Sequence, residues 1–219
     1  MLAKQLIQSN YPSVHLTDKV SFALRVMEDY DLQHIPVIND DKYIGIVSKD
    51  DLLDVEEAAP VASLQNQFAI IAIKSEEHFI TALKAAAQHR VSIVAVVNEQ
   101  LELQGVITLQ ELVYATSNFL SCNEPGGIIV LETEKRHFSF GEISRLVETN
   151  DAYITQLNTY IEAETGLIIV TIKVNTSEIS DIIATLQRFD YAIRYYFGEE
   201  QYANELKDNF NQLMFYLNM

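Results

Sequence analysis

Hydrophobic and polar positions over the first 60 residues switch between the spacing of helices and that of strands. From Lys19 to Tyr30 the apolar residues follow a helical period, and they are Val20, Ala23, Leu24, Val26 and Met27. Thr17 and Asp18, just before them, form a helix-start signal. The runs SVHL, HIPVIND and YIGIV predict strands, and Asp50 to Ala58 predicts a second, short helix. The pattern therefore predicts the order β-α-β-β-α.

The following 60 residues repeat this order. The second set of predicted elements is a strand FAIIAI, a helix from Ser75-Glu76 to about Gln88, strands SIVAVVN and LQGVIT, and a helix LQELVYATSNFL. Gly45 and Gly105 lie 60 residues apart, and Ser48 and Thr108 keep that offset. We therefore expect two domains, 1–60 and 61–121, that pack sheet to sheet as a pseudo-twofold pair.

A third unit follows the break at Asn123 to Gly127, which reads as a linker over residues 122–126. The predicted elements are strand 127–134, helix 140–148, the hairpin strands 154–162 and 167–175, helix 177–189 capped by Ser177, and strand 191–197. This β-α-β-β-α-β order predicts a ferredoxin-like domain over 127–197. The overall fold class is therefore α/β, or α+β.

The last stretch, 198–219, predicts one amphipathic helix. Its apolar stripe consists of Tyr202, Leu206, Phe210, Leu213, Met214 and Leu217. A helix with such a stripe docks either on its own domain or on a partner, and both remain open from the sequence.

Composition and charge limit the classes of binding partner that we expect. Hydrophobic residues make up 48% and charged residues 21%, which is typical of a soluble protein, and no apolar run reaches the ~18 residues of a membrane helix. The first residues lack a secretory signal, and Cys122 is the single cysteine, so we expect a cytoplasmic protein. The net charge of −16 argues against nucleic acid and anionic membranes as partners.

The segment GIVSKDDL, from Gly45 to Leu52, and its counterpart GVITLQEL carry the candidate chemistry. A hydroxyl at a helix start lies beside free N–H groups and the positive end of the helix dipole, which favours a phosphate. A carboxylate one turn later accepts hydrogen bonds from a ribose. Val14, Val37 and Ile38 provide an apolar slot for a purine, and Lys49 is the nearest cation. Glycine in the preceding strand admits either a ligand or another backbone.

A second interpretation is equally concrete. Ser or Thr followed three residues later by an acid is also the sequence of a helix cap. A capping box prefers Glu or Gln, so Thr108 and Glu111 favour a cap. Asp51 reaches back less well, so Ser48 and Asp51 favour a ligand.

The strand HIPVI, the turn and the segment from Gly45 to Asp51 resemble the motif of a CBS domain, and their duplication resembles a tandem CBS pair over residues 1–120. The second copy departs from the family: Val94 to Val97 lacks the proline, and Glu111 replaces the usual Asp. The resemblance implies a regulatory module that binds AMP, ADP, ATP or S-adenosylmethionine between the copies. It implies these nucleotide-binding residues: Val14, Pro36, Val37, Ile38, Gly45, Ser48, Lys49, Asp51, Thr108 and Glu111.

The unit 127–197 resembles an ACT domain, a class that often binds amino acids at a subunit interface. Its loop from Glu134 to Gly141 lacks the Pro-Gly turn of that family, and Phe138 occupies the place of the glycine. An amino-acid site and a sheet that only dimerises both remain open. The order CBS-CBS-ACT resembles bacterial CBS proteins of the acetoin-utilisation type.

Other chemistry is weakly represented. His34 at a strand edge is more often packed than functional, and no His or Cys spacing predicts a zinc site. No acid–base or nucleophile set can be named, so we predict no enzyme, no metal and no required cofactor. Two functions stay open beside an enzyme: a nucleotide sensor that signals through the third domain or a regulated partner protein, and a homodimeric or larger scaffold with degenerate sites.

Overall fold

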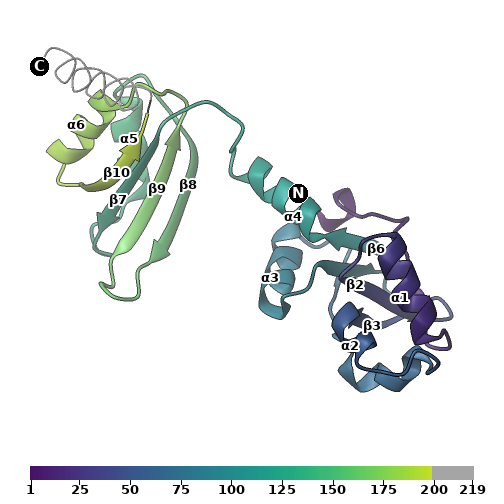
Figure 1. The fold of residues 1–219 in the computed structure, drawn as a ribbon. Coiled ribbons are helices and arrows are strands. Elements are labelled where there is room, and N and C mark those ends of the chain that lie inside the picture. The colour runs from purple at the N-terminus through teal and green to yellow at the C-terminus, as the bar shows by residue number, and fades with distance from the viewer. Residues whose placement is uncertain (199–219) are drawn as a thin grey trace, which may run out of the picture. The chain divides into compact units, whose positions relative to one another are not determined.

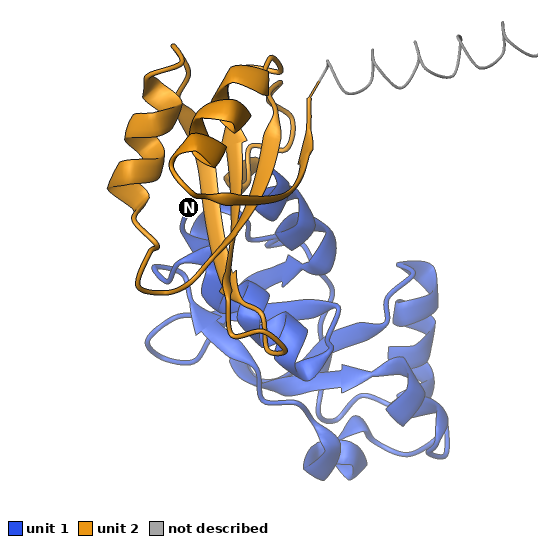
Figure 2. Cartoon of the chain, turned by 90° about the vertical axis from the view of Figure 1, so that its left-hand side faces the viewer, with its two compact units in different colours: residues 1–117 blue, residues 118–219 orange. Residues whose placement is uncertain are grey.

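The structure is a computed structural model that describes residues 1–198. The chain forms two compact units, of which the first spans residues 1–117 and the second begins at Asn118 (Figure 2). The predicted C-terminal helix, apart from Gly198, lies outside the described residues. Within 1–198 no helix is both long enough and apolar enough to span a bilayer.

The first unit contains the predicted duplication (Figure 1). The first repeat consists of β1 Val14–His15, α1 Val20–Asp29, β2 His34–Asn39, β3 Lys42–Ser48 and α2 Lys49–Leu53. The second repeat consists of β4 Ala72–Lys74, α3 Phe79–His89, β5 Ile93–Val97, β6 Leu103–Thr108 and α4 Leu109–Phe119. Short 3-10 helices, η1 Ala3–Gln5 and η2 Val61–Gln67, precede the two repeats. Each repeat has a three-stranded sheet, ordered β1-β2-β3 and β4-β5-β6, with one parallel and one antiparallel pair.

The same turn leads from the first strand to the first helix in both repeats. Asp18 Oδ2 accepts from the His15 N–H at 2.7 Å, and Glu77 Oε1 accepts from the Lys74 N–H at 2.9 Å. Asp18 therefore closes this turn and does not cap α1. The predicted helix start at Ser75-Glu76 was wrong for the same reason, because the turn delays α3 until Phe79.

In each repeat, a segment outside the sheet forms hydrogen bonds with a strand of the other repeat. The first crossing segment, residues 7–12, pairs with β6: Gln8 N–H donates to Val106 O at 2.8 Å, and Val106 N–H donates back at 3.2 Å. The second crossing segment, residues 67–71, pairs with β3, where Ala69 and Ile46 exchange two bonds of 2.9 Å. The predicted strand FAIIAI is therefore divided, and only its end belongs to β4.

The glycines that precede the two motifs make room for these crossings. A Cβ on Gly45 would lie 2.8 Å from Phe68 Cβ. A Cβ on Gly105 would lie 2.6 Å from Gln8 O, and its φ of +144° is a conformation that side chains rarely adopt. The sequence left open whether a ligand or another backbone segment approaches these glycines. The structure shows that another segment of the chain does.

Helix α2 ends at Leu53, so the predicted helix to Ala58 was too long. The residues after α2 form a turn, and their carbonyl groups accept hydrogen bonds from the start of α1. Helix α1 has no side-chain cap. Val20 N–H donates to Ala59 O at 2.9 Å, and Ser21 N–H donates to Glu57 O at 3.0 Å. These bonds satisfy backbone donors at the start of α1 that a longer α2 would leave without a protein partner.

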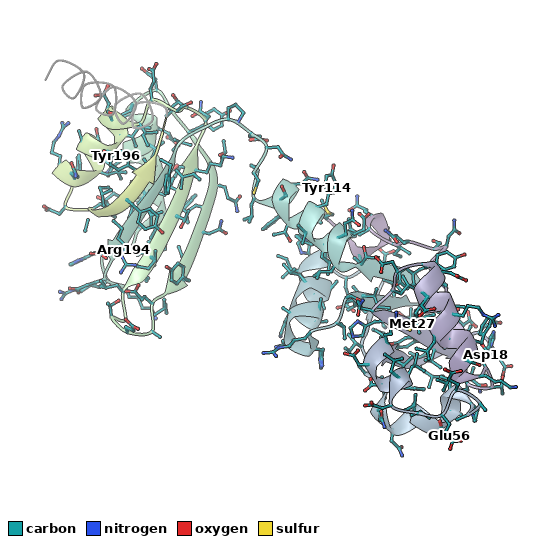
Figure 3. The ribbon with its side chains drawn as sticks, viewed as in Figure 1. Asp18, Met27, Glu56, Tyr114, Arg194 and Tyr196 are labelled. Atoms are coloured by element: carbon teal, nitrogen blue, oxygen red, sulfur yellow. The ribbon has the colours of Figure 1, made fainter. Side chains whose placement is uncertain are left out.

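Two hydrophobic clusters fill the first unit. The cluster of the first repeat includes Val14, Met27, Val37 and Leu52, and Met27 of α1 is fully buried (Figure 3). The cluster of the second repeat also contains residues from the first repeat and from the N-terminal segment, namely Ala3, Leu6, Tyr43 and Ile46. The two repeats therefore share a core.

The second unit has the predicted β-α-β-β-α-β order. Its elements are β7 Ile128–Thr133, α5 Phe140–Glu148, β8 Ile154–Ile161, β9 Ile168–Val174, α6 Ser180–Arg188 and β10 Ala192–Phe197. The antiparallel sheet is ordered β10-β7-β9-β8, and its core includes apolar residues of α5 and α6 (Figure 1). Ser177 does not cap α6, which begins at Ser180 with Ile179 at the N-cap.

Candidate ligand-binding site

The two repeats of the first unit meet at His34, the first residue of β2, and Ser92, which directly precedes β5. Ser92 N–H donates to His34 Nδ1 at 3.2 Å, and Ser92 Oγ lies 2.9 Å from the same nitrogen. Nδ1 is therefore an acceptor, which assigns the proton of the neutral ring to Nε2. Burial lowers the pKa of His34, against the opposing effect of Asp51 and Asp50, so the neutral form is favoured.

Both candidate helix starts lie close to this contact between the repeats. Ser48, which precedes α2, is paired with His34 across β3 and β2. Thr108, which precedes α4, is paired with Ile93 across β6 and β5. The hydroxyl of Tyr11, in the first crossing segment, donates to His34 O at 3.1 Å. The sheet ends, both helix starts and a crossing segment are thus brought together.

A cavity of about 660 Å³ lies beside Thr108. Its walls come from both repeats: residues 8–12 of the first crossing segment, residues 30–33 after α1, Ser92 and Ile93 at β5, and residues 108–110 at the start of α4. A volume of this size is within the range of small-molecule sites. The duplication therefore builds a pocket that neither repeat contains by itself.

The walls are rich in neutral hydrogen-bonding groups. Hydroxyls come from Ser9, Tyr11, Ser92 and Thr108, and side-chain amides come from Gln8, Asn10, Gln33 and Gln110. Burial raises the pKa of Tyr11 to about 12, so its hydroxyl stays protonated at neutral pH. Asp31 is the charged residue among those that line the cavity. Such walls favour a neutral or cationic polar ligand over a polyanion.

Thr108 and Glu111 divide two structural tasks. Thr108 Oγ1 accepts from Glu111 N–H at 3.2 Å and so caps α4. Glu111 Oε1 accepts from Gln8 Nε2 at 3.3 Å and so holds the first crossing segment. Thr108 lines the cavity while it caps the helix, as a residue at a helix start can do both.

Ser48 and Asp51 are bonded to each other. Ser48 Oγ accepts from Asp51 N–H at 3.0 Å, and the hydroxyl donates to Asp51 Oδ2 at 2.5 Å. The helix they begin has five residues, against eleven in α4. In both predicted pairs the hydroxyl therefore caps the helix, and the large cavity lies beside the second pair.

The other predicted residues lie apart from that cavity. Val14, Pro36 and Val37 are buried in the first sheet, and Gly45 packs against Phe68. Ile38 lines a separate cavity of about 380 Å³. Lys49 is half-buried, and its backbone N–H donates to Gln33 O at 2.9 Å. Of the ten predicted residues, Thr108 is the one that lines the large cavity.

Sequence reasoning missed most of the cavity walls. Asp31 and Tyr11 lie outside the motifs, and they reach the cavity because the first crossing segment and the turn after α1 meet at the start of α4. Ser92 stands in the second repeat where Gln33 stands in the first, because Leu109 N–H donates to Ser92 O as Lys49 N–H donates to Gln33 O, and both residues line the cavity. Within residues 1–198, no three His, Cys, Asp or Glu side chains are grouped so as to hold a metal ion.

Comparisons with known proteins agree with this architecture. Residues 3–58 match the family model of the CBS domain. Over 111 residues, half of this chain, the sequence is 26% identical to inosine-5'-monophosphate dehydrogenase from Methanocaldococcus jannaschii, and the match spans 22% of that enzyme.

Two solved structures are similar in fold. A CBS domain pair/ACT domain protein from Thermotoga maritima superposes with a TM-score of 0.50 and 23% identity, covering 55% of this chain and 99% of that one. A protein named for acetoin utilization, from Vibrio cholerae, has a TM-score of 0.49 and 20% identity, covering 57% of this chain and 98% of that one. The family match and the first structure confirm a CBS-type fold for about half of the chain.

Proposed function

We propose that the chain is a non-catalytic regulatory sensor that binds an adenine-containing ligand in the cavity beside Thr108. Proteins with a CBS domain pair are in general regulatory ligand sensors, and the fold match supports that class. The observation that carries the proposal is the cavity itself, because both repeats build it and a ligand there contacts both.

The lining residues favour particular ligands. Leu32, Ile93 and Leu109 supply apolar contacts for a purine, and the hydroxyls and amides supply partners for its edge and for a ribose. The N-terminus of α4 favours a single anionic group. Asp31 and the absence of Lys and Arg from the lining disfavour a triphosphate. AMP and S-adenosylmethionine therefore fit better than ADP or ATP.

Signal transfer follows from the position of α4. A ligand shifts an equilibrium only through different affinities for two states. Contacts to Thr108, Leu109 and Gln110 at one end of α4 bias its placement, and the other end of α4 reaches the second unit, which begins at Asn118. The ACT-like second unit, or a partner protein, would read the change.

Calorimetry on the full chain with AMP, ADP, ATP and S-adenosylmethionine tests the proposal. We expect Asp31→Asn to lower the affinity for S-adenosylmethionine about tenfold, because a charge-assisted contact is lost. The affinity for AMP should stay the same or increase. Asp31 has a φ of +52°, which Asn also tolerates, so the fold should be retained.

Asp51→Asn is the matched control, because Asp51 belongs to the other helix start. We expect it to change each affinity less than threefold. If all four ligands leave both heat and thermal midpoint unchanged at millimolar concentration, nucleotide sensing is excluded. If Asp51→Asn lowers the ligand affinity and Asp31→Asn does not, the ligand binds at Ser48 and Asp51 instead.

A homodimeric scaffold is the second candidate, and the surface of α4 favours it. Leu109, Val113 and Tyr114 are 48%, 62% and 62% exposed, and Tyr114 points away from the unit in Figure 3. Apolar side chains gathered on one helix are typical of an interface. Sedimentation of the full chain separates the candidates: a dimer that binds none of the four ligands supports the scaffold.

A further inference from the structure

The contact between His34 and Ser92 joins the two repeats through a bond that depends on protonation. Ser92 N–H donates to His34 Nδ1 at 3.2 Å, and this nitrogen accepts a hydrogen bond only while it carries no proton. Ser92 Oγ lies 2.9 Å from the same nitrogen. The ring is half-buried, so a donor or acceptor left without a partner here costs free energy.

Ser92 also connects this ring to the start of α4. Its carbonyl oxygen accepts from the N–H of Leu109, the first residue of α4, at 2.8 Å. Ser92 and Leu109 line the cavity beside Thr108, and both also line a further cavity of about 500 Å³ whose walls include His34. Ser92 therefore connects the ring to both cavities and to the helix start.

Charged groups act on the ring from several elements. Burial is the larger effect and lowers the pKa of His34, whereas Asp51 and Asp50 of α2 favour the protonated ring. Arg90, which follows α3, lines the further cavity together with His34, and its positive charge disfavours a second cation there. Two other residues with titratable side chains hydrogen-bond to the backbone of residues 33–34, through the hydroxyl of Tyr11 and the N–H of Lys49. The ring is therefore neutral at pH 7.

We propose that His34 and Ser92 form a proton-sensitive latch between the repeats, closed when His34 is neutral and open when it is protonated. A proton on Nδ1 faces the Ser92 N–H, so two donors meet and the amide loses its acceptor. The protonated ring can still donate to Ser92 Oγ, but that bond leaves the Ser92 amide unsatisfied. Opening frees Ser92 to move, and with it the bond that holds Leu109 and the wall that the two cavities share.

The lowered pKa fixes the direction of the effect. The closed latch contributes stability that is fully present above pH 6.5, the ordinary pKa of histidine. This contribution is lost as pH falls through the lower pKa of His34 in the folded protein. The latch is a property of the chain alone, so it does not depend on which ligand binds beside Thr108.

An NMR titration of the full chain from about pH 7.5 to about pH 5 tests the latch. We expect the His34 ring and the amides of Ser92 and Leu109 to shift with one common midpoint below 6.5. Hydrogen exchange of the Ser92 amide, corrected for the intrinsic effect of pH, should become about tenfold faster across this midpoint. His34→Gln, whose side-chain oxygen accepts a hydrogen bond but does not titrate, should abolish these changes at both amides.

Two further variants make the outcome specific. His89→Gln removes an exposed imidazole at the end of α3 that lines neither cavity, and both amides should respond as in the unmodified chain. Ser92→Ala keeps the backbone N–H and removes only Oγ, so the changes at residues 92 and 109 should persist. A Ser92 amide that does not respond while the His34 ring titrates would overturn the proposal. Changes at both amides that persist in His34→Gln would also overturn it.

Discussion

At the residue scale, Gly45 and Gly105 are required by packing between the repeats. A Cβ on Gly105 would meet Gln8 O at 2.6 Å and Ile7 Cγ2 at 2.7 Å, and its φ is +144°. We expect Gly105→Ala to lower the free energy of unfolding of the first unit by about 1–3 kcal/mol, the usual cost of overpacking. Urea denaturation followed by circular dichroism measures the change.

Gly141 provides the matched control for this substitution. It lies in α5, and a Cβ there would meet no atom within 4 Å. Gly141→Ala should stabilise the second unit by about 0.5–1 kcal/mol, because Ala loses less backbone entropy in a helix than Gly does. A mild effect of Gly105→Ala, similar in size to that of Gly141→Ala, would contradict the crossing geometry.

At the element scale, Arg194 joins β10 to residues across the sheet. Its Nε donates to Glu132 Oε2 at 2.6 Å, and its Nη1 and Nη2 donate to the two Glu162 oxygens at 2.8 Å each. Arg194 occupies the irregular position in the pairing of β10 with β7, and Figure 3 shows it on the sheet. Glu162 follows β8, so the cluster connects the two edge strands.

The cluster predicts a pH-dependent stability. Hydrogen bonds from Arg194, with a smaller effect of Thr165, lower the pKa of Glu162 below its ordinary 4.5. Glu162 therefore contributes stability that is present above pH 4.5 and is lost as pH falls through its lowered pKa. We expect Arg194→Gln to lower the thermal midpoint of the second unit at pH 7, and this deficit to shrink between pH 4.5 and pH 3.

Thermal melts of both proteins from pH 7 to pH 3 give the deficit at each pH. Arg145→Gln is the control, because Arg145 is 68% exposed and lies 4.0 Å from Glu142, so its loss should matter little. A deficit for Arg194→Gln that stays constant down to pH 3 would show that the charge of Glu162 is not involved.

At the scale of the whole molecule, local pattern predicted the order of the elements and long-range pairing decided their ends. The spacing of hydrophobic residues in β6 and in α5 predicted bounds that the structure confirms, because local sequence determines where these two elements begin and end. The ends of α2 and β4 were wrong, because Glu57 and Ala59 bond to α1 and Ala69 bonds to Ile46. The cavity walls share this limit, since Asp31 and Tyr11 reach Thr108 only through tertiary contacts.

The exchange of segments between the repeats makes the first ten residues part of the second repeat. Ala3 N–H donates to Glu77 O at 2.8 Å, Gln8 pairs with Val106, and Ala3 and Leu6 are buried in the core of the second repeat. Deletion of residues 1–10 should therefore loosen β6 and the start of α3 more than β1 and β2. We expect amides there, including that of Val106, to exchange at least tenfold faster, which corresponds to about 1.4 kcal/mol.

Hydrogen exchange read by mass spectrometry measures this, with Lys4→Ala as control because the ion pair of Lys4 with Glu76 is exposed and contributes little. Faster exchange confined to the first repeat would mean that each repeat holds its own segment, and the cavity beside Thr108 would then lose its wall of residues 8–12.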